Sequence, residues 1–311
     1  MSGPSTTAAW QEVRNSRLRA RLDLVGLTPL MEITNGSPEV AIGLIDGPVS
    51  TDHADLALSN VKDIRSSRAV ACSHAGSVAC MHGTYVAGIL IAGRASEAPA
   101  ICPGCALLVR PIFLEATTGI DDPRADLAEL AEALTDCTDA RVRVVNVSAA
   151  LAQPWIKDDR ALTEALDHAA RRGVIVVVAA GNQGTLGSTA ITRHPWVIPV
   201  VSYDEHGRPQ NHSNIGRSIG RSGLGAPGVE ITSVGADGWP LTSSGTSAAA
   251  PFVTGAVALL CSAFPDASGN EIKSALLEVR TRRRSTVVPP LMDAWSAHQV
   301  LRGTRRMRRS R

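Results

Sequence analysis

The chain has 311 residues, of which 44% are hydrophobic, and it carries a formal net charge of +2 and six cysteines. This length and apolar fraction predict one large globular domain with a sizeable core and exclude a wholly disordered chain. No stretch is expected to span a membrane and no nucleic-acid-binding module is recognisable, so neither a membrane nor nucleic acid is an expected partner.

The first segment, residues 10–27, is predicted to form an amphipathic helix with a loose apolar stripe of Trp10, Val13, Leu18, Leu22 and Val25. We expect residues 1–37 to be a helical extension that packs on the following domain; covering or regulating a substrate groove is the alternative. The segment lacks the uninterrupted apolar core of a secretory signal, which favours a cytoplasmic location.

After residue 37, short apolar runs alternate with helical patterns. Candidate strands lie near residues 40–45, 106–112, 143–147, 174–179 and 197–201, and candidate helices near 83–92, 124–135, 160–172, 247–263 and 269–279. This alternation predicts an α/β fold with a mainly parallel central sheet and helices on both faces. We assign residues 38–280 to this domain. Residues 281–311 form a C-terminal segment whose arginine-rich end is predicted to be a disordered tail.

Three short motifs carry residues suited to nucleophilic catalysis. Asp46 ends the first apolar run, where a carboxylate can orient a base, although Asp-Gly is also common in plain turns. His82 opens a helix rich in small residues, a position that a capping histidine could also hold. Ser247 follows a glycine turn that opens an apolar helix, where the hydroxyl is exposed and the helix N-terminus favours a developing oxyanion. Serine is also a common N-cap, so each motif alone has an ordinary structural explanation.

Taken together and in this order, the motifs resemble the subtilisin-like serine proteases, or subtilases, over roughly residues 38–280. The order Asp, His, Ser is one of the known chain orders of the hydrolytic triad. The family's strand before the oxyanion asparagine is similar to residues 174–184. Its segment before the nucleophile is similar to residues 225–228, and its groove strand to residues 144–148. The resemblance implies a three-layer subtilisin-like fold.

The same resemblance implies a role for each matching residue. Ser247 would be the nucleophile, His82 the general base and Asp46 the group that orients it. Asn182 and the backbone N–H of Ser247 would form the oxyanion hole. The walls of the substrate groove would be formed by Ser148, Ala149, Ala150 and Gly181.

Residues 194–202 and 213–228 resemble, more narrowly, the cyanobactin-type proteases that mature ribosomally made peptides. That similarity implies limited cleavage of a precursor peptide, and an acidic leader on the peptide would suit the arginine-rich tail. An intracellular degradative subtilisin is the alternative; a peptide-binding pseudoprotease is disfavoured because the catalytic residue types are all present. No cofactor is expected. Residues 92–100, where many subtilases bind calcium, offer one carboxylate and an arginine, so no calcium is expected at that position.

The cysteines leave several explanations open. Cys137 and Cys261 lie in or beside helical patterns and are expected to be small buried side chains. Cys72 with Cys80, and Cys102 with Cys105, form two close pairs. Disulfides, free thiols and a zinc site remain alternatives for these four residues.

Overall fold

The structure is a computed structural model that describes residues 6–56, 60–64, 72–113, 126–148, 159–278 and 286–309. Its centre is a seven-stranded sheet in the order β2-β3-β1-β4-β5-β6-β7, and every strand pair in it is parallel. The strands are β1 (Ala41–Asp46), β2 (Asn60–Asp63), β3 (Ala106–Pro111), β4 (Val144–Val147), β5 (Ile175–Ala179), β6 (Val197–Tyr203) and β7 (Leu224–Pro227). A separate antiparallel pair is formed by β8 (Ile231–Val234) and β9 (Pro240–Ser243).

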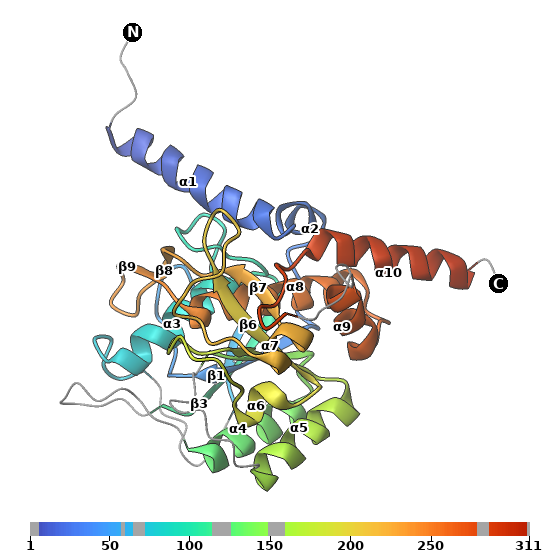
Figure 1. Ribbon diagram of the computed structural model, residues 1–311. Helices are drawn as coiled ribbons and strands as arrows, with labels where there is room; N and C mark the ends of the chain where they lie inside the picture. The colour runs from blue at the N-terminus through green and yellow to red at the C-terminus, as the bar shows by residue number, and fades with distance from the viewer. Residues whose placement is uncertain are drawn as a thin grey trace.

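Helices cover both faces of the central sheet (Figure 1). Successive strand residues point to opposite faces, so Leu44 joins one apolar cluster and Ile45 joins another. The first cluster contains α3 (Val78–Ile91) and α8 (Thr246–Ala263), and the second contains α4 (Leu127–Asp139) and α5 (Arg160–Arg172). The short helices α6 (Ala190–Arg193) and α7 (Arg217–Ser222) flank β6. The predicted three-layer α/β fold is confirmed.

Helix α8 corrects the expectation that no segment is apolar enough to cross a membrane. By length and composition alone, Thr246–Ala263 passes that test. Residues 248–261 are all buried, however, and the helix contacts β4, β5, β6 and β7. The helix is therefore apolar because it lies inside the core of the domain.

The N-terminal helices α1 (Thr6–Leu24) and α2 (Thr28–Ile33) lie at one end of the molecule (Figure 1). Leu22 and Val25 are buried in the main core, and Leu18 packs against it. The C-terminal end of α1 therefore packs on the domain, as the sequence predicts. The side chains of Trp10 and Val13 lie outside the described residues.

The C-terminal segment differs from the disordered tail that the sequence predicts. After α9 (Gly269–Glu278), the chain ends in α10 (Ala294–Arg309), which contacts α9 and α2. Ala294, Ala297 and Leu301 are buried at helical spacing. These apolar residues anchor one face of α10, and Arg302 and Arg306 are exposed on it, so the segment is a helix and not a free coil.

Candidate active site

The carboxyl ends of three central strands lie at one edge of the sheet. The register pairs Ile45 with Val147 and Val147 with Val178. Asp46 at the end of β1, Ser148 after β4 and the loop after β5 therefore reach the same edge. In open α/β sheets this is the edge where ligands bind.

Asp46 and His82 form a hydrogen-bonded pair. The Asp46 side chain is fully buried. Its Oδ1 accepts a hydrogen bond from the backbone N–H of Gly47 at 2.7 Å and lies 2.7 Å from Nδ1 of His82. The His82 side chain keeps 32% of its surface exposed. The buried carboxylate thus fixes one ring nitrogen of a histidine whose other side can meet solvent or substrate.

Glycines allow α3 to approach the turn that follows Asp46. A Cβ on Gly83 would collide with the carbonyl oxygens of Gly47 and Pro48, and one on Gly47 would collide with the backbone of Ala79. The helix itself begins at the N-cap Ser77, whose side chain accepts a hydrogen bond from the N–H of Cys80 at 3.2 Å. Backbone contact at these glycines brings His82 within reach of the strand end.

The environment of His82 raises its pKa above the ordinary value of 6.5. Burial is the largest single influence and acts to lower the pKa, because it disfavours the charged ring. The negative charge of Asp46 and its hydrogen bond act in the opposite direction and together outweigh burial. The ring is consequently a stronger base than a free histidine, and Asp46 is the cause.

Ser247 is the second residue of α8 and is half-buried. The preceding Gly245 has φ of 136°, a conformation that favours glycine. Pro251 lies inside the helix, at position i+4 from Ser247, and has no N–H to donate to the Ser247 carbonyl. The Ser148 hydroxyl donates to that carbonyl instead, at 3.3 Å.

This contact belongs to a buried polar chain that joins β4 to α8. Asn146 donates from Nδ2 to the Ser148 hydroxyl at 2.6 Å. Its Oδ1 accepts a hydrogen bond from the Thr254 hydroxyl at 2.8 Å. Asn146 and Thr254 are fully buried and Ser148 nearly so. The chain of bonds fixes the first turn of α8 relative to the end of β4.

Asn182 is exposed and reaches the N-terminus of α8. Its Oδ1 accepts from the backbone N–H of Thr246 at 2.9 Å and from the Thr246 hydroxyl at 3.0 Å. The Thr246 hydroxyl in turn accepts from the N–H of Gly181 at 3.1 Å. Because two donors of Thr246 face Oδ1, the orientation of the amide is determined, and Nδ2 lies near Gly245 as the group left to donate.

The structure therefore places each residue singled out by the sequence, with one gap. Asp46, His82, Ser148, Gly181, Asn182 and Ser247 belong to segments that meet at this edge. Ala149 and Ala150, expected in the groove wall, lie outside the described residues.

Sequence reasoning did not single out Thr246 and gave Ser148 only a role in the groove wall. The proline at i+4 was a usable signal, because it predicts an unpaired Ser247 carbonyl.

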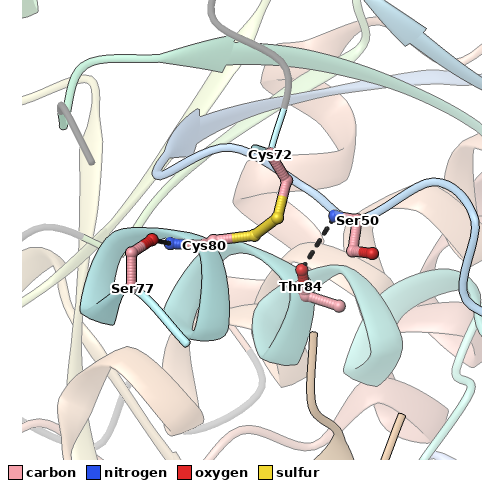
Figure 2. The surroundings of a disulfide bond; sticks show 5 residues. All are labelled: Ser50, Cys72, Ser77, Cys80 and Thr84. Carbon is pink, nitrogen blue, oxygen red and sulfur yellow. Dashed lines mark hydrogen bonds between the residues drawn. A yellow bond between two sulfur atoms is a disulfide. The ribbon is translucent and has the colours of Figure 1, made fainter. Parts of the chain in front are cut away.

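The cysteines divide into one disulfide and four buried thiols. Cys72 and Cys80 form a disulfide that ties the preceding loop to the first turn of α3 (Figure 2). Cys102 and Cys105 are unbridged. A hydrogen bond between these two thiols, together with burial, raises the pKa of Cys102, while the bond lowers that of Cys105. A four-cysteine zinc site is therefore wrong, and within the described residues no group of three metal-binding side chains occurs.

Cys137 and Cys261 are buried, as the sequence predicts. Burial raises the pKa of the Cys137 thiol to about 12 and that of Cys261 to about 11. Both therefore remain protonated and act as small apolar side chains.

Comparison with known proteins identifies the family. Residues 37–289 match the subtilase family of peptidases. This chain is a subtilase. Among curated relatives of this subtilase, Subtilisin DY of Bacillus licheniformis is 27% identical over 247 residues, covering 78% of the chain and 84% of the relative. The subtilase is thus a serine endopeptidase, as expected.

Solved structures give the same result for the fold. The protease domain of PatA, in a variant form, matches this subtilase with a TM-score of 0.78 at 26% identity, covering 86% of this chain and 97% of that one. The prenylagaramide maturation protease PagA matches with a TM-score of 0.78 at 26% identity, covering 89% and 99%.

Proposed function

We propose that Asp46, His82 and Ser247 are the catalytic triad of this serine endopeptidase. The observation that supports the proposal most directly is the 2.7 Å hydrogen bond between Asp46 Oδ1 and His82 Nδ1. This bond keeps the proton on Nδ1, so Nε2 is available to accept a proton from a serine hydroxyl.

Each residue then has a defined step in peptide-bond cleavage. The Ser247 hydroxyl attacks the scissile carbonyl while His82 takes its proton. His82 returns that proton to the leaving amine, and Asp46 stabilises the imidazolium formed between these steps. The oxyanion accepts hydrogen bonds from the Asn182 amide and the N–H of Ser247. Water then repeats the sequence on the acyl-enzyme and releases the acid.

The proposed physiological reaction is limited cleavage of a ribosomally made precursor peptide. The support is similarity over most of this chain to PatA and PagA, which are both maturation proteases. We place the reaction in the cytoplasm, as expected from the sequence. Digestion of generic proteins, as by a degradative subtilisin, is the competing outcome.

Helix α10 is the proposed contact for a leader peptide. Arg302 and Arg306 are exposed on this helix. A row of arginines complements an acidic leader, and such attraction between exposed charges weakens as salt increases. Removal of residues after Leu301 is expected to raise KM for a peptide with an acidic leader and to leave kcat unchanged. The increase should shrink at high salt and be absent for the same peptide with a neutral leader.

Two substrates test the proposed function. One is an internally quenched peptide with an acidic leader, and the other is casein. The wild-type protein should cleave the peptide at one bond and digest casein poorly, while the Ser247→Ala variant should cleave neither. Sequence-indifferent digestion of casein at the peptide's rate would contradict maturation, and activity in Ser247→Ala would contradict the triad.

A further inference from the structure

The loop that presents Asn182 needs external support to hold its shape. Residues 180–185 follow β5 without regular secondary structure. Gly181 and Gly184 adopt φ of 103° and 63° in this loop. The exposed Asn182 side chain accepts hydrogen bonds from Thr246 through its oxygen. The position of its Nδ2 therefore depends on how firmly the loop backbone is held.

The side chain of Asn214 supplies that support. Its Oδ1 accepts from the N–H of Gln183 at 3.1 Å, the N–H of Thr185 at 3.0 Å and the Thr185 hydroxyl at 3.0 Å. Its Nδ2 donates to the Ala180 carbonyl at 3.1 Å and to the Gln183 side-chain oxygen at 2.7 Å. These five bonds reach residues on both sides of Asn182.

Asn214 is built into the structure at this point. It is 8% exposed, and both Nδ2 protons have acceptors. Its backbone N–H donates to the Gly181 carbonyl at 2.8 Å. A Cβ on Gly181 would collide with Asn214 Nδ2. The glycine is therefore required for the close approach of the asparagine to the loop.

We infer that Asn214 is a positioning residue for the Asn182 amide, and this inference rests on the proposed oxyanion role of Asn182. The interaction that matters forms only with the charged oxygen of the transition state, so displacement of the amide should lower kcat and spare substrate binding. A displacement of about 1 Å can cost on the order of 100-fold in rate. Asn214 itself need not touch the substrate.

A double-variant cycle on a quenched peptide tests this inference. Removal of one oxyanion donor costs about 100- to 1,000-fold in kcat in a subtilisin, and we expect a loss of that order for Asn182→Ala. We expect Asn214→Ala to lower kcat by about 10- to 100-fold with little change in KM. In a protein that already carries Asn182→Ala, Asn214→Ala should have almost no further effect on kcat, because the amide that Asn214 positions is already gone.

Inhibitor binding supplies a readout that lost stability alone would not change. A peptide aldehyde forms a tetrahedral adduct whose oxygen needs the oxyanion donors, whereas a product peptide does not. Asn214→Ala should weaken the aldehyde by the same factor as kcat and leave product affinity unchanged. Lys273→Met is the stability control, because Lys273 bonds to Pro195 at the far end of β6. It should lower the melting temperature without lowering kcat.

Two results would overturn the inference. One is an unchanged kcat in Asn214→Ala; the other is an equal loss of kcat with and without Asn182. An Asn182→Ala variant of full activity would instead remove the proposed oxyanion role itself, and the inference with it. Should Asn214→Ala fail to fold, Thr185→Val removes one of the five bonds and should lower kcat about two- to fivefold, again only when Asn182 is present.

Discussion

Substitution of Ser148 by alanine should reveal how the first turn of α8 is stabilised. The hydroxyl donates to the Ser247 carbonyl at 3.3 Å and accepts from Asn146 Nδ2 at 2.6 Å. Alanine breaks both bonds in a buried position. The Ser247 carbonyl cannot recover an intrahelical donor, because Pro251 occupies position i+4.

The expected cost follows from these two bonds. A neutral hydrogen bond contributes about 1 kcal/mol to stability, and a buried polar group left without a partner costs about 1–3 kcal/mol. The 3.3 Å bond is long and the 2.6 Å bond is short, so most of the loss should come from Asn146. We expect Ser148→Ala to lower the free energy of unfolding by about 2–3 kcal/mol.

Substitution of Pro251 by alanine should recover part of this loss. Alanine restores an N–H at position i+4, which can donate to the Ser247 carbonyl in place of the lost hydroxyl. The loss in free energy of unfolding caused by Ser148→Ala should therefore be about 1 kcal/mol smaller in a protein that carries Pro251→Ala than in the wild type. Pro251→Ala alone sets the baseline, since it also releases entropy to the unfolded chain.

Denaturant unfolding measures all four members of the cycle. Each protein should carry Ser247→Ala, which keeps the carbonyl and prevents self-digestion. The midpoint and slope then give the free energy of unfolding for each variant. A cost of Ser148→Ala that is equal in the two backgrounds, within about 0.5 kcal/mol, would refute the proposed exchange of donors.

The remaining predictions concern pH and the disulfide. Since Asp46 raises the pKa of His82 above 6.5, the acidic limb of kcat/KM should lie above that value, and Asp46→Asn should move it to lower pH; an unmoved limb would contradict this pairing. The raised pKa also means that the pair stabilises the fold fully below pH of about 6.5 and ceases to do so as pH rises through the folded pKa, which unfolding of wild type and Asp46→Asn across this range would show. Cys72 and Cys80 enclose a short loop, with a separation of 8 residues, and reduction should lower stability by about 2–3 kcal/mol. Alkylation of the unfolded protein should modify four thiols before reduction and six after it; six before reduction would contradict the bond.

The sequence was sufficient for the features that depend on local pattern. Buried parallel strands such as β5 are continuous apolar runs, so their residues predict both the strand and the edge where it ends. Asp46 stands at such a strand end and Ser247 in the first turn of α8, as the sequence predicts. His82 was expected to open its helix, but α3 begins at Val78, so His82 lies in the second turn.

Other features depend on contacts that no local pattern encodes. β2 is short and mostly exposed, and β9 is partly exposed and polar, so neither has a buried apolar run. Asn214 lies in a polar coil, and its importance appears only when the loop after β5 is placed against it. The many arginines at the C-terminus predicted a disordered tail, whereas the buried residues Ala294, Ala297 and Leu301 anchor α10 as a helix.

Labelling with a fluorophosphonate probe tests the central claim most directly. If His82 and the oxyanion donors activate one hydroxyl, the probe should modify Ser247 alone, and labelling should disappear in Ser247→Ala and fall steeply in His82→Ala. Peptide mapping would locate the adduct. An adduct on Ser243 or Ser244, or full peptidase activity in Ser247→Ala, would contradict the assignment of this site.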